Sequence, residues 1–380
     1  MGEKIKGSTF SIEKIAAFLL AAVLFVYTLI HIKFILAPLI FAIFISLLLL
    51  PLQRRLERKI KRRGLSTVIV ITGIIAVIAG LLTFFSIQLV EVFQNIPTIS
   101  GKLKAGLNQI FVWANEQFGL NKNDGIVWVK ENFSRLLDAP LSFLSKGVTS
   151  STQFLVDAFL ALIAVFYFLA YKDPIRKVIL LQFSSTNREG GARVLVEIQQ
   201  AVSKYLSGLL IVILILAVLN SLGLWLIGVG YPIFFGIVAA VMVIIPYFGT
   251  TIGGLIPFLY SAATFEHWWQ PLAVIGMYAG VQQIEGNFIT PNIVGSSVKI
   301  NFFVAFVSLF IGGVLWGLSG IVLALPLAAI IKIICDAVDI LKPVGFLMSN
   351  EILDRKGKFE NEWDDDRYRL SSIFKNRSRS

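Results

Sequence analysis

Charge, cysteine and histidine are all scarce in this sequence of 380 residues. Only 15% of the residues are charged, where a soluble domain carries about 25%, and 56% are hydrophobic, which excludes an ordinary soluble protein. The single cysteine, Cys335, excludes an intramolecular disulfide, a thiolate metal cluster and a CxxC redox pair. The two histidines, His31 and His267, are far apart in the chain, which argues against a histidine metal site.

Catalytic and nucleotide-binding motifs are also missing. The sequence contains no GxxxxGK[ST] loop, no HExxH and no GxSxG elbow. We therefore expect a protein that is not an enzyme, that is not driven by ATP bound to this chain, and that holds no cofactor or metal.

Long apolar runs are what the sequence does have. A bilayer core about 30 Å thick needs about 20 apolar helical residues per crossing, and nine runs approach or exceed that length: 12 to 30, 33 to 51, 66 to 90, 152 to 171, 204 to 228, 231 to 264, 271 to 290, 302 to 318 and 320 to 341. The first run lacks a cleavage site and is interpreted as a retained membrane helix. We predict an all-α polytopic integral membrane protein with about eight transmembrane helices plus one broken helical hairpin.

The hairpin is assigned to the run at 231 to 264. Its 34 residues are too many for one crossing and few for two, and they are interrupted by Pro246, Gly249, Gly253, Gly254 and Pro257. Backbone that leaves the helix at membrane depth is tolerated where protein or water satisfies it. Both a re-entrant hairpin and two full crossings fit the pattern.

The positive charge predicts the orientation. Lys and Arg outnumber Asp and Glu by 34 − 23 = 11, but the bases lie beside apolar runs, so they indicate topology and no nucleic-acid partner. Seven bases between 54 and 63 mark a cytoplasmic loop, which places both termini in the cytoplasm. The resulting division is membrane helices 1 to 3 in 1–90, an extracytoplasmic helical insert in 91–150, membrane helix 4 in 151–171, a cytoplasmic segment in 172–203, a C-terminal transport core in 204–341 and a cytoplasmic polar tail in 342–380.

Glu285 is the sharpest candidate for function. A charge near the bilayer centre costs about 2.5–3.5 kcal/mol, so such a residue faces a cavity or a partner. The alternatives are a structural polar contact and an exposed helix end near Lys299. Asn220 and Gln283 could add amides to the same cavity or act as glue between helices.

Two predicted helix breaks flank this glutamate, and discontinuous helices form ion and substrate sites in transporters. One contains Pro246, Gly249, Thr250 and Thr251, and the other runs from Asn287 through Pro291 to Gly295. Three GxxxG spacings, at 249 to 253, 276 to 280 and 313 to 317, predict closely packed membrane helices.

Several of these segments together resemble the autoinducer-2 exporter (AI-2E) family of bacterial membrane proteins. They are Gly223 to Gly254, Gln283 to Pro291 with Val294-Gly295, Trp316 to Gly320, Pro326-Leu327-Ala328 and Lys332. Carried over by position, the family pattern falls on Pro246, Gly249, Glu285, Gly286, Asn287, Pro291, Gly295, Gly317, Gly320 and Pro326. After Lys299 the chain reads Ile300-Asn301-Phe302, where many relatives carry a proline.

The resemblance implies a multi-pass protein of the bacterial cytoplasmic membrane that forms homo-oligomers. It implies a secondary transporter that exports a small hydrophilic solute similar to autoinducer-2. Ion coupling at Glu285 is our hypothesis from the residues described above. A sodium or lithium/proton antiporter is the alternative within transport. A non-transporting membrane scaffold, with the insert and the tail as binding modules, is the alternative from another class. Membrane lipid and a small-molecule or monovalent-cation substrate are the expected partners.

Overall fold

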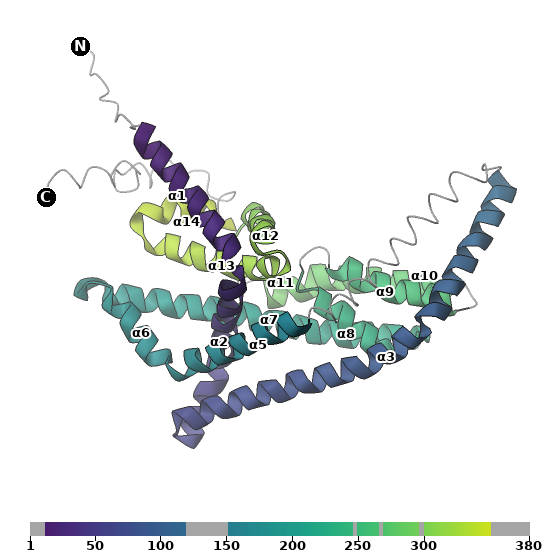
Figure 1. Cartoon of the computed structure of the whole chain (residues 1–380), viewed down its shortest axis with the longest axis horizontal. Helices are drawn as coiled ribbons and strands as arrows, with labels where there is room; N and C mark the ends of the chain where they lie inside the picture. The colour runs from purple at the N-terminus through teal and green to yellow at the C-terminus, as the bar shows by residue number, and fades with distance from the viewer. Residues whose placement is uncertain (1–11, 119–150, 246–248, 266–268, 296–299, 351–380) are drawn as a thin grey trace, which may run out of the picture.

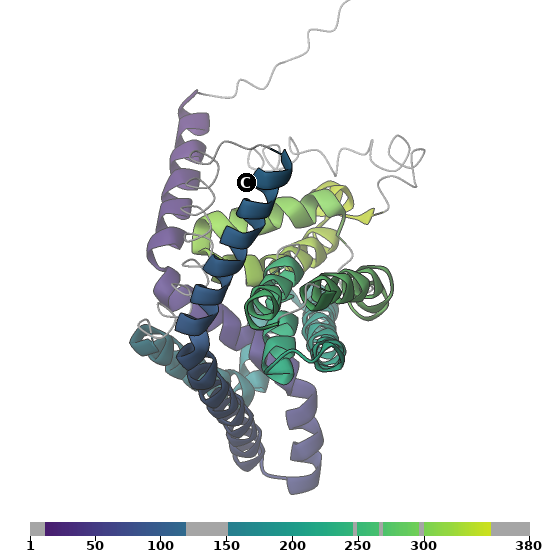
Figure 2. The same ribbon diagram turned by 90° about the vertical axis from the view of Figure 1, so that its right-hand side faces the viewer.

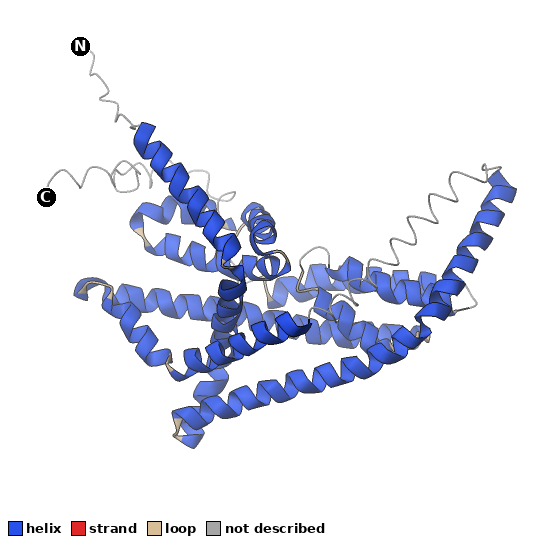
Figure 3. Cartoon of the chain, viewed as in Figure 1, coloured by secondary structure: helices blue, strands red, loops and turns tan. Residues whose placement is uncertain are grey.

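The computed structural model describes residues 12–118, 151–245, 249–265, 269–295 and 300–350, and these ranges contain helices and no strand (Figure 3). The elements are α1 (Ile12–His31), α2 (Lys33–Ile60), α3 (Arg63–Phe118), α5 (Ser151–Ala170), α6 (Lys172–Leu181), η1 (Ser185–Asn187), α7 (Arg188–Ile227), α8 (Pro232–Met242), α9 (Gly249–Thr264), α10 (Trp269–Ile284), the π-helix η2 (Glu285–Ile289), α11 (Thr290–Ile293), α12 (Phe302–Trp316), α13 (Leu318–Ala337), η3 (Asp339–Leu341) and α14 (Lys342–Leu347) (Figure 1). The predicted all-α fold is confirmed.

The basic segment after the second apolar run is mostly helical. α2 continues to Ile60, so Arg54, Arg55, Arg58 and Lys59 lie on its last turns and not in a loop. The helix ends at Lys61, whose positive φ of 58° places it in the left-handed region. Long unbranched bases are good helix formers, so nothing in the segment stops α2 at the membrane surface.

A buried polar network joins α2, α3 and α5 at this end. The Gln53 amide is fully buried and donates to Thr67 Oγ1 at 2.7 Å and to the Leu169 carbonyl at 3.2 Å. Lys172 donates to Gln53 Oε1 at 2.9 Å and also pairs with Glu57. Because these contacts join the segment around 54–63 to the start of 172–203, the two segments predicted to be cytoplasmic lie on the same side of the fold.

α3 is longer than predicted. It runs without a break from Arg63 to Phe118, through the boundary at 90 between membrane helix and insert. A helix of 56 residues measures about 84 Å along its axis, far more than the apolar bilayer core. The C-terminal part of α3 accordingly turns away from the other helices (Figure 1).

Four helices of the C-terminal half form the most closely packed part. α7 contacts α8 and α10, while α9 contacts α8 and α10, and the group is seen end-on in Figure 2. Leu224, Phe234, Phe235 and Val274 fill one core of this group, which α3 covers through the ring of Phe85. A second core, between α7 and α8, holds the candidate site described below.

α12 and α13 form a tight hairpin. Gly317 joins them with a φ of 61°, a conformation that L side chains rarely adopt. Gly312 and Gly320 then allow the two helices to touch, because a Cβ on either would collide with the other's carbonyl group. Asn301 caps α12 by accepting from the Val304 N–H at 2.8 Å, and its own N–H donates to the Met348 carbonyl at 2.8 Å. Asn301 thus links α12 to the segment after α14.

Among the described residues, four helices are long and apolar enough to span a membrane, namely α2, the first 30 residues of α3, α7 and α13. The bent pair of α5 and α6 makes a fifth if it counts as one span, and α8 and α12 are shorter apolar helices. The predicted number of eight crossings is therefore not confirmed. Apolar side chains are nevertheless on the outside, and only 6% of the spanning window of α3 is buried, as expected for helices that face lipid.

Candidate transport site

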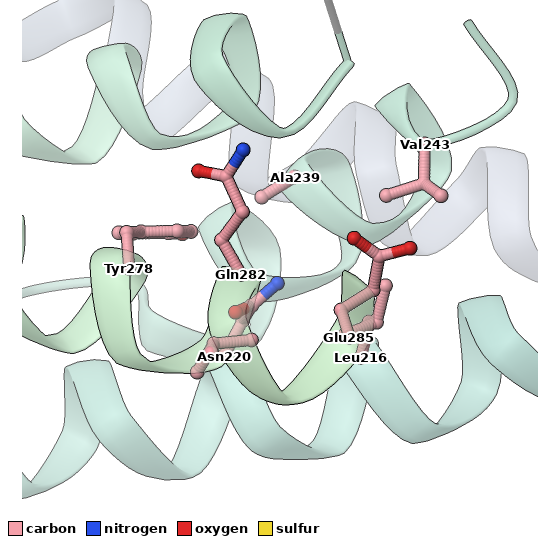
Figure 4. Close-up of a pocket in the computed structure, with 8 residues that line it drawn as sticks. Leu216, Asn220, Ala239, Val243, Tyr278, Gln282 and Glu285 are labelled. Atoms are coloured by element: carbon pink, nitrogen blue, oxygen red, sulfur yellow. The ribbon is translucent and has the colours of Figure 1, made fainter. Parts of the chain in front are cut away.

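A small cavity lies between α7, α8 and α10 in the C-terminal bundle. Its wall combines apolar residues with four polar side chains, and it is lined by Leu216, Asn220, Ala239, Val243, Tyr278, Val281, Gln282 and Glu285 (Figure 4). The cavity measures about 10 Å³, the space of about one water molecule. The helical repeat places three of its polar residues, Tyr278 and Gln282 of α10 and Glu285 of η2, on the face directed at α7 and α8.

Two polar atoms in this wall lack hydrogen-bond partners. Asn220 is only 4% exposed, and its Oδ1 atom is buried with no partner among the described residues. The Tyr278 hydroxyl is also buried and has no hydrogen-bond partner among the described residues. Leaving such a group unpaired costs about 1–3 kcal/mol, so a fold that brings two of them to one cavity is suited to receive a hydrogen-bonding ligand.

Glu285 begins the π-helix. The Thr290 N–H donates to the Glu285 carbonyl, the i to i+5 pattern of a π turn, and the Thr290 hydroxyl donates to the Glu285 carboxylate. π turns inside α-helices frequently mark functional sites. Glu285 is half-buried and forms no ion pair with Lys or Arg within the described ranges. Among the described residues, its carboxylate is held by the Thr290 hydroxyl.

The segment predicted as the second break, Asn287 to Gly295, is helical over most of its length. From Trp269 to Ile293 the backbone stays helical and widens into the π turn instead of unwinding. Pro291 lies in the first turn of α11, directly after the π turn. The helix ends just before Gly295, which is exposed.

The first predicted break separates α8 from α9. The two helices run back along one another: a Cβ on Gly249 would collide with the Met242 carbonyl, and one on Gly253 would lie 2.7 Å from the Ala239 Cα. A Cβ on Gly254 would lie 3.0 Å from the ring of Tyr278, so the glycine makes room for the tyrosine of the cavity. The three glycines therefore let α9 pack closely against both α8 and α10.

The opposite face of α10 is open. Gly276, Gly280, Gln283 and Asn287 follow one another at spacings of four, three and four residues, and all are exposed. A Cβ on either glycine would meet nothing within 4 Å. Asn287 donates to the Gln283 carbonyl at 2.9 Å and to its side-chain oxygen at 3.0 Å, so these amides satisfy each other.

The remaining predicted site residues are dispersed. Thr250 and Thr251 lie in the first turn of α9, and Pro246 and Lys299 lie outside the described residues. Gly286 is exposed in the π turn, while Gly317, Gly320 and Pro326 belong to the α12–α13 hairpin. Of the predicted polar group, the structure brings Asn220 and Glu285 together and places Gln283 and Asn287 on the other face.

Tyr278 and Gln282 belong to the cavity but were not among the predicted residues. Their spacing of seven and three residues before Glu285 was the available signal, because it puts all three on one helical face.

Comparison with known proteins gives one consistent result. The family model described as AI-2E family transporter matches residues 15–340. The chain is 31% identical over 314 residues to "Putative transport protein YrrI" of Bacillus subtilis, covering 80% of this chain and 86% of that protein. It is 25% identical over 305 residues to "AI-2 transport protein TqsA" of Escherichia coli, covering 79% and 85%, and 25% identical over 216 residues to "Putative permease PerM" of Escherichia coli, covering 54% and 58%.

Proposed function

The chain belongs to the AI-2E family of transporters, and we propose that it is an ion-coupled secondary transporter whose solute passes between α7, α8 and α10. The observation that carries the proposal is the convergence of Asn220, Tyr278, Gln282 and Glu285 on one cavity. Hydrogen-bonding groups held among apolar helices are suited to a small hydrophilic solute. The relative TqsA is named an AI-2 transport protein, so a solute of that size and polarity is the first to test.

Glu285 is proposed to bind the coupling ion. Glu285 lies in an apolar helical bundle and forms no ion pair within the described ranges, a setting in which a charge is costly to hold. Binding of a proton or a monovalent cation removes that cost. The unpaired Asn220 and Tyr278 atoms are close enough to line the same cavity, so solute binding and ion binding at Glu285 can influence one another there.

Movement of the α8–α9 hairpin is proposed to open the path. A cavity of about 10 Å³ admits one water molecule and not a solute of several heavy atoms. The two helices of the hairpin are separated by the break between Met242 and Gly249, and they pack through backbone contacts at Gly253. Short helices with a break at one end can move as a unit while the long α7 stays in place.

The open face of α10 is proposed to contact a second copy of the chain. Small residues such as Gly276 and Gly280 let membrane helices approach closely, and the amides Gln283 and Asn287 on the same face are unfavourable against lipid. Both properties fit a homo-oligomer.

A flux assay tests the proposal. Proteoliposomes with the wild-type chain should take up or release the AI-2-type solute in response to a proton or sodium gradient. Glu285→Gln should abolish gradient-driven flux. It should not change the exchange of solute across the membrane when the solute concentrations on the two sides are equal. Glu197→Gln removes an exposed carboxylate of α7 and should behave as wild type. Wild-type coupling in Glu285→Gln would refute the role of Glu285, and cation-driven pH changes without solute flux would point to an antiporter instead.

A further inference from the structure

A second and larger cavity lies at the end of the molecule that holds the basic residues. It measures about 410 Å³ and is enclosed by α2, α5, α6 and α7. This volume falls within the range of small-molecule sites, about 300–1,000 Å³. It is separate from the transport cavity, because the two share no lining residue.

Most of its wall is apolar, and its charged residues come from two short stretches. α2, α5, α6 and α7 contribute mainly Ile, Leu, Val and Phe side chains, while the charged lining consists of Arg54 on α2 and of Lys172, Asp173 and Arg176 on α6. A site with apolar walls and charged residues at one end fits an amphiphile better than a fully hydrophilic solute.

Two of the positive charges have no ion-pair partner among the described residues. Lys172 pairs with Glu57, and Asp173 pairs with Arg63. Arg54 and Arg176 are exposed and form no ion pair within the described ranges. The cavity therefore offers two arginines to a negatively charged group, and the guanidinium group is well suited to phosphate.

α6 places this site at the membrane surface. It is bent by 72° from α5, so it runs across the direction of that span. Its exposed side chains include Val178 and Leu181 as well as Arg176 and Lys177, the composition of a helix that lies in the lipid interface. Basic pockets between membrane helices at the cytoplasmic surface are known to bind anionic lipid head groups.

We propose that the cavity between α2, α5, α6 and α7 binds one anionic phospholipid. Arg54 and Arg176 hold the phosphate, and the acyl chains lie along the apolar wall. The lipid belongs to the leaflet on the side of the basic segment 54–63, which the sequence predicts to be cytoplasmic. This proposal does not depend on the transport proposal, because it uses none of the residues around Glu285.

Native mass spectrometry of the detergent-purified full chain tests the site. The chain is titrated with phosphatidylglycerol or phosphatidylcholine of the same acyl chains, and the occupancy of the first bound lipid is measured. The wild type should prefer phosphatidylglycerol by about tenfold or more, since each base near an anionic lipid favours binding and two act together here. Arg54→Gln with Arg176→Gln should abolish the preference, and Arg176→Gln alone should lose part of it.

The control removes the same charge outside the cavity. Arg55→Gln with Arg58→Gln changes two exposed arginines of α2 that do not line it, and should keep the preference. Equal loss in both double variants would overturn the proposal, because the effect would then be general surface charge. Displacement of the lipid by millimolar glycerol phosphate would also overturn it, because the site would then serve a soluble phosphate compound. Equal binding of phosphatidylglycerol and phosphatidylcholine by the wild type would overturn the proposal as well.

Discussion

Asn220→Leu is predicted to stabilise the protein while abolishing transport. Asn220 is buried in α7, and its Oδ1 atom has no hydrogen-bond partner among the described residues. If Asn220 were glue between helices, its amide would be paired and its replacement would weaken the fold. Its unpaired Oδ1 atom instead supports our proposal that the amide is retained for a ligand at a cost in stability.

The magnitude follows from the burial of that amide. Removing an unsatisfied buried polar group relieves about 1–3 kcal/mol. Fitting the larger leucine costs part of this gain, since overpacking costs about 1–3 kcal/mol, although the adjoining cavity of about 10 Å³ gives some room. We expect a net stabilisation of about 1 kcal/mol.

Gln53→Leu is the matched control, because it also replaces a buried amide by leucine. Gln53 is fully paired: it donates to Thr67 and to the Leu169 carbonyl and accepts from Lys172. Replacing it leaves those partners unsatisfied, at about 1–3 kcal/mol for each group that stays buried. We expect a loss of about 3 kcal/mol, so the two substitutions should change stability in opposite directions.

The assay is the apparent melting temperature of the purified chain in one detergent at one scan rate, together with solute flux in proteoliposomes. Asn220→Leu should melt slightly above wild type and transport nothing, while Gln53→Leu should melt several degrees lower. The reasoning is refuted if Asn220→Leu melts as far below wild type as Gln53→Leu, or if it keeps wild-type flux.

Three further results are expected. Gly253→Ala should lower stability by about 1–3 kcal/mol, because its Cβ would lie 2.7 Å from the α8 backbone; Gly276→Ala, with nothing within 4 Å, should be neutral or gain about 0.5–1 kcal/mol in thermal melts. Lys172→Met breaks a half-buried ion pair and should lower the free energy of unfolding by more than Lys342→Met, which breaks an exposed pair. In a denaturant titration the loss for Lys342→Met should be less than about 1 kcal/mol. Arg58→Cys, in a chain freed of its native cysteine, should react with an impermeant maleimide only in inverted vesicles, and labelling in intact cells would reverse the predicted topology.

Hydropathy and turn residues predicted a large part of the fold. The all-α architecture and the family are confirmed, and the run at 231–264 does divide into two helices, because its prolines and glycines interrupt it at a definite place. The length of α3 was not predicted, because hydropathy marks where the apolar run ends and not where the helix ends, and α3 continues past 90 through Pro97 and Gly101. The bases after 54 were likewise assigned to a loop, although Arg and Lys extend a helix readily.

The candidate site was predicted only in part. Glu285 and Asn220 could be found because charge and amide groups are rare in apolar runs, and the structure brings both to one cavity. Tyr278 and Gln282 depend on which face of α10 meets α7, and the π turn depends on tertiary packing around Glu285. Gln53 and the α6 bend could not be predicted, because the contacts that fix them join residues more than a hundred positions apart.

The accessibility of position 285 tests the central claim, that this cavity lies on the transport path. The experiment introduces Glu285→Cys into a chain that carries Cys335→Ala. Membrane vesicles with this variant are treated with a small charged thiol reagent, with and without solute. Val274→Cys, fully buried on the same helix, is the control. The account predicts labelling at 285 that the solute slows, and none at 274. Equal resistance at both positions, under every gradient applied, would contradict it.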